Sequence, residues 1–525
     1  MWTKAVAVER LARKGRVVFR HQGRQICLFD LGERGIFACN NRCPHEGYPL
    51  REGTVDAACV VTCHWHNWKF DLATGDNLYG GDRLRIYPVT VRDGEVWVDL
   101  TDPPPQARKA GLLACLHDAF IDHDYERIAR ELGRLMLAGG DPLEAVVHAI
   151  RWCHERLEYG WSHAFAGTAD WLRLYDERST AEDRLICLLE AIGHMADDAL
   201  RQPVYPYPDA VRPFAEEDFI AAVEAEDEAQ AVAGLRGALA AGLRFPDLER
   251  VLSRAALRHY NSFGHTLIYV AKAGELIRRL GPAVEEPLLL ALVRSMVYAT
   301  REDRIPQFRE YANALERWGR RPGGGAPDAG AYRGLSVFKA LTLTADAGAA
   351  DPQALYGALL GANAWNMLAF AADVYENHVD RPLADNVGWL DFTHGLTFAN
   401  AVRRQCSRFP GLWPAGLLQM ACFCGRNAPY TLAEPPLERW RVDDPERFFA
   451  TALDTVLDHG RDQYIVSVHW LKTVLAVREE CQAGTAGVMN DVLLAALNRL
   501  LHSPLHLKHV RRTARQALDF VGRDG

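Results

Sequence analysis

The first hundred residues alternate short hydrophobic runs with polar breaks. The runs are RVVFR (16–20), QICLFDL (25–31), GIFACN (35–40) and EVWVDL (95–100). They are rich in β-branched and aromatic residues, as strands are, and glycine, aspartate or arginine separates them. Asp93 and Gly94 mark a hairpin turn before the last run. The pattern predicts a small antiparallel barrel or sandwich of short strands over residues 1–100.

The pattern changes after a proline-rich stretch, TDPPPQARKAG, which predicts a linker over residues 101–112. Beyond it, apolar residues recur every three or four positions, as in DYERIARELGRLMLA (124–138) and VLLAALNRLLH (492–502). That spacing places apolar side chains on one face of a helix. We therefore predict an all-α domain over residues 113–525. The fold class is a multidomain chain with a small all-β domain followed by a large all-α domain.

The composition narrows the classes of partner. The 525 residues carry a net charge of -8, so no excess of basic residues points to nucleic acid. The longest apolar runs are far too short to cross a bilayer, and charges interrupt the N-terminal segment, which argues against a signal peptide. We expect a cytoplasmic protein with no membrane partner. Its 12 cysteines are then thiols or metal ligands rather than disulfides.

Two loops of the β region combine cysteine with histidine. CPHEGYPL (43–50) contains Cys43 and His45, and CHWHNWKF (63–70) contains Cys63 and His66. Two thiolates and two imidazoles could bind zinc, so a zinc site stays an alternative. Zinc fingers, however, more often pair like residues, whereas each loop here provides one cysteine and one histidine. In a Rieske centre two cysteines hold one iron and two histidines hold the other, so each loop reaches both irons.

The run CPHEGYPL…CHWHNWKFDLATGDN resembles the Rieske [2Fe-2S] family, and the resemblance covers residues 1–100. It implies that Cys43 and Cys63 hold the inner iron of a [2Fe-2S] cluster, and that His45 and His66 hold the outer iron near the surface. Respiratory Rieske proteins of high potential carry one more cysteine in each loop, which neither loop has here. The resemblance therefore implies the ferredoxin and oxygenase type, toward the lower part of a range of about -150 to +300 mV.

A Rieske centre transfers one electron at a time, so we expect the helical domain either to consume electrons or to dock a partner. The mononuclear iron domain that usually accompanies a Rieske domain supplies its ligands from a D-x2-H-x4-H-like run, and the sequence has no such run. It also lacks the E-x2-H pairs of a di-iron bundle. Asp391 and His394 form its D-x2-H pair. Any second metal must therefore have a different set of ligands.

Four histidines lie in strongly apolar helical segments. They are His163 in GWSHAFAGTADWL, His265 in NSFGHTLIYVAKAGEL, His394 in LDFTHGLTFANAVRR and His469 in IVSVHWLKTVLAV. A lone histidine on an apolar helix is more often a hydrogen-bonded core residue, so that interpretation stays open. Four in similar settings, in a chain with an iron-sulfur domain, favour a shared metal ion. Asp391, one turn before His394, is expected to orient that histidine.

Two lysines accompany these histidines. Lys472 follows His469 by three residues, on the same side of a helix, and Lys272 follows His265 by seven. Burial among apolar neighbours lowers the pKa of a lysine and frees its amine. A neutral amine can add CO2 to become a carbamate, which is an anionic metal ligand. The alternative is that both lysines extend to solvent.

The order of these segments resembles the questin oxidase-like family of all-helical oxygenases over residues 120–490. The matching positions are His163, His265, the H-x2-T run from His394 to Thr397, and the H-x2-K run from His469 to Lys472. The resemblance implies a non-haem iron held by these histidines and by a modified lysine, with aromatic polyketides as substrates. The middle segment departs from the family, because Tyr269 and Lys272 stand where an arginine and a second histidine are usual.

Together these expectations predict a Rieske-coupled non-haem Fe(II) oxygenase that uses O2 to oxygenate or cleave an aromatic or quinone ring. Lys472 and Asp391 are its expected catalytic residues. No G-x-G-x-x-G motif follows a strand, so electrons would come from an external NAD(P)H-dependent reductase or ferredoxin reductase. Family analogy implies a homo-oligomer if the cluster must reach a neighbouring subunit. Two alternatives stay open: an electron carrier whose helical domain only docks a partner, and a helical enzyme that uses another metal or none.

Overall fold

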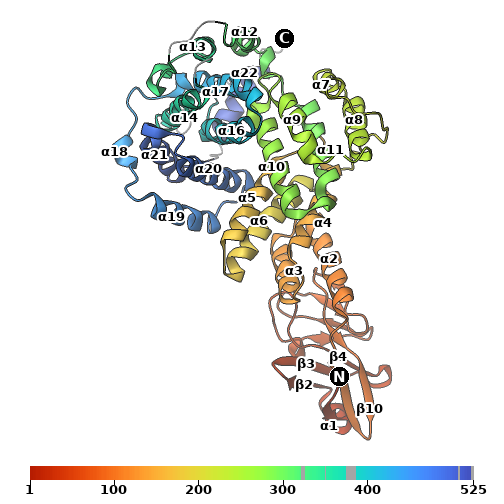
Figure 1. Ribbon diagram of the computed structural model, residues 1–525. Helices are drawn as coiled ribbons and strands as arrows, with labels where there is room; N and C mark the ends of the chain where they lie inside the picture. The colour runs from red at the N-terminus through yellow and green to blue at the C-terminus, as the bar shows by residue number, and fades with distance from the viewer. Residues whose placement is uncertain (321–324, 349–350, 374–385, 506–508, 522–525) are drawn as a thin grey trace. The chain divides into compact units, whose positions relative to one another are not determined.

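The computed structural model describes residues 1–320, 325–348, 351–373, 386–505 and 509–521 (Figure 1). It divides into two compact units, Met1–Ala145 and Val146–Gly525. The first unit contains the strands and the second is helical, so the predicted fold class is confirmed. No helix in these described ranges is long and apolar enough to cross a membrane.

The strands of the first unit pair antiparallel throughout. They are β1 (Trp2–Ala7), β2 (Arg16–His21), β3 (Arg24–Asp30), β4 (Ile36–Asn40), β5 (Thr54–Val55), β6 (Val60–Thr62), β7 (Lys69–Asp71), β8 (Asn77–Tyr79), β9 (Ile86–Tyr87), β10 (Val89–Arg92) and β11 (Glu95–Asp99). The sheet orders are β1-β11-β10, β2-β3-β4-β9 and β5-β6-β7-β8. The predicted turn at Asp93 and Gly94 joins β10 to β11 with φ angles of 48° and 75°, which fits a type I′ hairpin.

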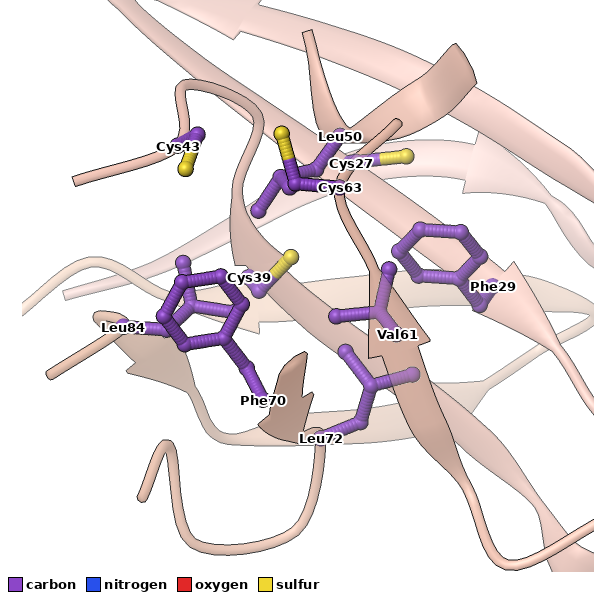
Figure 2. Packing of buried hydrophobic residues seen from close by; sticks show 10 residues of the cluster. All are labelled: Cys27, Phe29, Cys39, Cys43, Leu50, Val61, Cys63, Phe70, Leu72 and Leu84. Atoms are coloured by element: carbon purple, nitrogen blue, oxygen red, sulfur yellow. The ribbon is translucent and has the colours of Figure 1, made fainter. Parts of the chain in front are cut away.

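Strand β3 is buried on both faces, which explains its nearly continuous apolar run. Successive side chains of a strand point to opposite faces. Cys27 and Phe29 therefore enter one hydrophobic cluster, whereas Ile26 and Leu28 enter another. The first cluster also contains the cysteine of each Cys/His loop, and Figure 2 shows these side chains together. Each loop is thus held by its cysteine, which packs in the hydrophobic core of the first unit.

The first unit also contains helices α1 (Val8–Lys14), α2 (Pro105–Ile121) and α3 (Tyr125–Leu137), and α4 (Leu143–Cys153) crosses the boundary between the units. Residues 105–112, the second part of the expected linker, form the first turns of α2. Pro105 is tolerated there because the first helical N–H needs no partner within the helix. Asp124 caps α3 by accepting a hydrogen bond from the Arg127 N–H at 3.0 Å. Helices α2 and α3 pack on each other.

The second unit is a helical assembly. Its α-helices are α5 (His163–Glu177), α6 (Ala181–Ala199), α7 (Glu216–Glu224), α8 (Glu228–Ala240), α9 (Phe245–Ala256), α10 (His265–Leu280), α11 (Glu285–Val297), α12 (Glu310–Arg317), α13 (Val337–Ala347), α14 (Pro352–Leu368), α16 (Trp389–Arg408), α17 (Trp413–Asn427), α18 (Leu437–Trp440), α19 (Pro445–Leu457), α20 (Tyr464–Ala483), α21 (Asn490–Leu501) and α22 (Val510–Val521). Four of them form a closed ring: α5 packs on α10, α10 on α16, α16 on α20, and α20 on α5. We call this group the four-helix ring.

Candidate metal centres

The two Cys/His loops of the first unit have the same backbone design. The N–H of Cys43 donates to the carbonyl oxygen of Tyr48 at 2.9 Å, and the N–H of Cys63 donates to that of Trp68 at 2.8 Å. In both loops the residue four positions after the cysteine has a positive φ, 79° at Gly47 and 62° at Asn67. These are the residue types that adopt this conformation at little cost. Each loop therefore closes tightly on its own cysteine.

The thiols lie inside and the imidazoles lie further out. Cys43 and Cys63 are 4% and 1% exposed, whereas the side chains of His45 and His66 are 16% and 40% exposed. The two imidazole rings are 4.7 Å apart between centroids. A buried pair of thiols and a more exposed pair of adjacent imidazoles match the inner and outer donors that a mixed cluster requires.

The chemistry of these donors fits an iron-sulfur cluster. Burial raises the pKa of Cys43 to about 12, and the adjacent Cys63 thiol contributes to the rise while the backbone N–H of His45 opposes it. The protein alone therefore does not favour the Cys43 thiolate, although the thiolate is the form of cysteine that binds metals. A bound metal cation deprotonates its thiols, so the buried pair is suited to iron.

The Rieske [2Fe-2S] domain family matches residues 1–83. The chain belongs to the Rieske [2Fe-2S] family through this N-terminal domain. The 3-phenylpropionate/cinnamic acid dioxygenase ferredoxin subunit of Escherichia coli (strain K12) is 35% identical over 82 residues, which cover 15% of this chain and 76% of that protein. The predicted Rieske domain is thereby confirmed, and it carries a [2Fe-2S] cluster for electron transfer. The assignment of its individual ligands stays a prediction.

Two further relatives show how far the likeness extends. The 4beta-methylsterol monooxygenase of Methylococcus capsulatus is 34% identical over 95 residues, 16% of this chain and 26% of that protein. A Rieske domain-containing protein of Homo sapiens is 31% identical over 103 residues, 16% of this chain and 64% of that protein. This chain therefore spans about a quarter of the first protein and under two thirds of the second. Each likeness covers 16% of this chain, a share similar to that of the Rieske match over residues 1–83.

In the second unit, the four histidines singled out from the sequence meet inside the four-helix ring, one from each helix. The Nε2 atom of His265 lies 3.1 Å from that of His163 and 2.8 Å from that of His394. The ring of His469 lies 4.8 Å from that of His163 and 5.1 Å from that of His394, between centroids. Ligand atoms of His163, His265 and His394 lie within 4.8 Å of one another, as in a metal site. We call these four residues the histidine cluster.

Local structure places two of these histidines at helix starts. His163 is the first residue of α5, after Ser162, whose hydroxyl caps the helix by accepting from the Ala164 N–H. His265 is the first residue of α10, after Gly264 with a φ of 73°. A Cβ at Gly264 would lie 2.4 Å from the ring of Phe398 on α16. Only glycine fits this approach, so Gly264 brings α10 and α16 close enough for His265 and His394 to meet.

Backbone carbonyls fix three of the imidazoles. Nδ1 of His265, His394 and His469 faces the carbonyl oxygens of Ser262, Leu390 and Ile465, at 2.6, 2.5 and 2.6 Å respectively. A carbonyl oxygen only accepts, so each Nδ1 carries the proton and donates it. The lone pair of a neutral ring is then on Nε2. The Nε2 atoms of His265 and His394 are also the ones that meet other members of the cluster.

The lone pairs make the histidine cluster suited to a cation. Burial, reinforced by Lys472, lowers the pKa of His163 and His394 well below the usual value and that of His265 to about 3. These three imidazoles are therefore neutral, and the Nε2 lone pairs of His265 and His394, 2.8 Å apart, repel unless a cation lies between them. Protons are disfavoured by the low pKa values. A transition-metal ion that prefers imidazole is the partner that fits, and iron, zinc, copper and nickel all belong to that class.

The two lysines have different surroundings in the structure. Lys472 is buried, with Nζ 3.5 Å from Nε2 of His394, and burial lowers its pKa to about 7. Lys272 instead forms ion pairs with Asp170 at 2.7 Å and Glu275 at 3.2 Å. Burial opposes its charge, but both carboxylates outweigh burial and raise the pKa of Lys272. The expectation that Lys272 offers a neutral amine is therefore wrong, because its carboxylate partners keep it protonated.

The expected role of Asp391 is also wrong. Its carboxylate accepts from the backbone N–H of Gly388 and from Arg426, both at 2.8 Å, and thereby caps α16. His394 is oriented by the carbonyl of Leu390. An aspartate three residues before a histidine lies near it on a helix, but at the first turn the free backbone N–H groups attract the carboxylate. Asp391 is thus a helix cap and an ion-pair partner.

The sequence interpretation missed Asp170. This residue is 1% exposed, one oxygen bonds Lys272, and Oδ2 has no hydrogen-bond partner among the described residues. Burial raises its pKa, while Lys272 opposes the rise. A signal was present, because Asp170 follows His163 by seven residues, as Lys272 follows His265. Equal offsets from two meeting histidines place both residues two turns along adjacent helices, where they can pair.

An enclosed cavity adjoins the histidine cluster. His163, His265, Lys472 and Asp170 line it, and its volume is about 20 Å³ for the centres of water-sized molecules. That volume holds one small molecule of about the size of water. Arg173 and Arg404 line both this cavity and a larger pocket of about 500 Å³. The side chains of these two arginines therefore lie between the small cavity and the larger pocket.

Proposed function

We propose that this chain is a Rieske-coupled non-haem iron oxygenase. The [2Fe-2S] cluster receives single electrons from an external NAD(P)H-dependent reductase or ferredoxin reductase, and the helical unit uses them with O2 to oxygenate or cleave an aromatic or quinone ring. The observation that carries this proposal is the meeting of four imidazoles, one from each helix of the ring, in a chain with a Rieske domain. The questin oxidase-like assignment of the helical unit belongs to the same proposal.

The histidine cluster would hold the iron. His163, His265 and His394 are its proposed ligands, with His469 beside them and Lys472 as a further ligand if CO2 converts its amine to a carbamate. Bound Fe(II) would supply the activation of O2 at open coordination positions. The backbone carbonyls hold the imidazoles in the tautomer that a metal needs, and the apolar helices exclude water. Lys472, with a pKa of about 7, can hold or release a proton at Nζ.

The two cavities suggest separate places for the two reactants. The small cavity suits O2, which is close to water in size. We place the aromatic substrate in the larger pocket, whose volume of about 500 Å³ is in the range of small-molecule sites. The matched relatives support this class of reaction, because one is named a dioxygenase ferredoxin subunit and another a monooxygenase.

Oxygen consumption tests the proposal. Purified protein with its iron restored, supplied with NADPH and a ferredoxin reductase, should consume O2 faster when a hydroxylated anthraquinone is added. The His394→Ala protein should lose this stimulation and keep its Rieske spectrum. The competing function, an electron carrier with a docking module, predicts reduction of the cluster without any stimulated oxygen uptake in either protein.

A further inference from the structure

Helix α3 reaches the cluster-binding loop of the Rieske domain. Nη2 of Arg134 donates to the carbonyl oxygen of Pro44 at 2.9 Å, and the same nitrogen donates to Oδ2 of Asp82 at 2.6 Å. Pro44 stands between Cys43 and His45, one expected ligand of each iron. A single guanidinium therefore connects a helix outside the family match, which ends at residue 83, with the loop that would hold the cluster.

Asp82 is the anchor of this connection. It is fully buried and binds Arg130 through two hydrogen bonds of 2.9 and 3.0 Å, besides the bond from Arg134. Burial alone would raise the pKa of Asp82, but Arg130 and Arg134 outweigh it and lower that pKa, so the carboxylate stays ionised. Arg127 lies 3.8 Å away. These arginines recur at spacings of three and four, so one face of α3 presents all three to Asp82.

Two glycines before Asp82 leave the space that the packing of α3 against the Rieske domain needs. A Cβ at Gly81 would lie 2.9 Å from the Arg127 side chain, and a Cβ at Gly80 would lie 2.3 Å from the ring of Trp68. Trp68 in turn stacks on His45, with ring centroids 4.3 Å apart and planes 9° from parallel. The sequence Gly80-Gly81-Asp82 therefore allows Trp68 to support an expected ligand and α3 to dock beside it.

The contact region pairs three arginines with three carboxylates. Arg127, Arg130 and Arg134 face Asp82, and Glu131 bonds Arg134 at 2.5 Å. Arg127 also lies 3.8 Å from the exposed carboxylate of Asp118. Removing Arg134 would therefore leave an excess of negative charge beside the Pro44 loop. Asp82 is fully buried and Arg127 is nearly so, so salt screens these charges less than surface charges.

We propose that Arg134 is a positioning residue of the Rieske centre, which fixes the Pro44 carbonyl and raises the reduction potential of the cluster. Reduction adds one negative charge to the cluster, and a nearby guanidinium stabilises the reduced form. Its hydrogen bond also partly neutralises the negative end of the Pro44 carbonyl dipole. Hydrogen bonds and charge around the sulfurs and ligands are known determinants of such potentials. Helix α3 is then a working part of the electron-transfer domain.

A redox titration of the full-length protein tests the proposal, with the cluster assembled and the reduced form followed by electron paramagnetic resonance. The variant is Arg134→Gln. The matched control is Arg130→Gln, which removes the same charge from Asp82, whereas the hydrogen bond to Pro44 comes from Arg134. At a fixed potential, Arg134→Gln should lower the ratio of reduced to oxidised cluster about tenfold, which for one electron is about 59 mV. Arg130→Gln should lower it by less than about threefold, the effect of charge at longer range.

Arg134→Lys separates position from charge. Lysine keeps the positive charge but lacks the fork that reaches Asp82 and Pro44 together. Its protein should show a changed resonance line shape with a smaller change in the ratio than Arg134→Gln. Equal ratios in Arg134→Gln and the parent protein would overturn the proposal, and so would equal shifts in the two glutamine variants. Should Arg134→Gln fail to assemble the cluster, Arg134→Lys decides: an unaltered line shape overturns the positioning role.

Discussion

In the Rieske domain all four expected ligands lie between residues 43 and 66, on two loops that close by the same local hydrogen bond. In the helical unit the four histidines lie between residues 163 and 469, one on each helix of a ring. The backbone of two loops positions the expected ligands of the first centre, whereas the tertiary packing of helices positions those of the second. The first is therefore expected to survive local changes elsewhere, whereas the second depends on every helix that contributes to it.

The largest effect should come from removing one member of the histidine cluster. His394→Ala should lower the iron content by one atom per chain and abolish stimulated oxygen uptake, by at least about a hundredfold. Because the two centres lie in separate compact units, the Rieske resonance should not change. His502→Ala, at the end of α21, is the control and should keep all iron. Equal iron in both variants would show that the histidine cluster binds none.

The reverse experiment removes the loop centre. Cys63→Ser should abolish the Rieske resonance, because serine is a poor substitute for a thiolate ligand of iron. The helical iron should remain, at one atom per chain. Cys187→Ser, at a buried cysteine of α6, is the matched control for a lost thiol. A Rieske signal that survives in the Cys63 variant would contradict the ligand assignment.

Replacing Lys272 should destabilise the helical unit strongly. Lys272→Met leaves Asp170 and Glu275 without their shared cation, and breaking a buried ion pair costs about 3–5 kcal/mol. The raised pKa of Lys272 means that its contribution is fully present below pH 10.5, its value in the unfolded chain, and is lost as pH rises through the folded value. Urea unfolding of the metal-free variant should therefore show about the same large loss at pH 7 and at pH 10, since both lie below 10.5. A loss at pH 10 far smaller than at pH 7 would contradict the raised pKa, and a negligible loss at pH 7 would contradict the ion pair.

Replacing Lys472 should instead increase the stability of the metal-free helical unit at pH 7. Burial lowers its pKa from 10.5 to about 7, so the unfolded chain binds more protons between these values. Stability should therefore rise with pH through this window. In the metal-free protein, Lys472→Met should remove that dependence and raise the free energy of unfolding at pH 7 by a few kcal/mol, at about 1.4 kcal/mol per pKa unit. A pH dependence identical to that of the parent protein would exclude a buried neutral amine at this position.

The smallest effect concerns the approach of α10 to α16. Gly264→Ala combines a positive φ with a Cβ 2.4 Å from the Phe398 ring, and it should cost about 2–3 kcal/mol. Gly484→Ala, after the end of α20, has the same left-handed backbone conformation, with a φ of 66°, and no atom within 4 Å of the added Cβ, so it should cost about 1 kcal/mol. Thermal unfolding compares them. Equal costs would mean that backbone conformation alone decides, and that the close approach of the helices is not tight.

These two centres also differ in how much the sequence predicts. The short apolar runs predicted the strands and the Cys/His spacing predicted the Rieske domain, because both signals are local. The histidines were recognisable from their apolar settings, but the partners of Asp391 and Lys272 were not. Asp391 pairs with Arg426, 35 residues away in the sequence, and Lys272 pairs with Asp170, 102 residues away. The contact between the arginines of α3 and Asp82 was not predicted for the same reason. Helical spacing shows that a face is charged, but not what that face contacts.

Mössbauer spectroscopy of dithionite-reduced protein enriched in 57Fe tests the central claim most directly. Two iron sites belong to the Rieske cluster, one held by thiolates and one by imidazoles. The account predicts a third component, high-spin Fe(II) with about one third of the total area, which disappears in His394→Ala while the other two persist. Only the two cluster components, in equal areas in both proteins, would contradict an iron site in the histidine cluster and leave the chain an electron carrier.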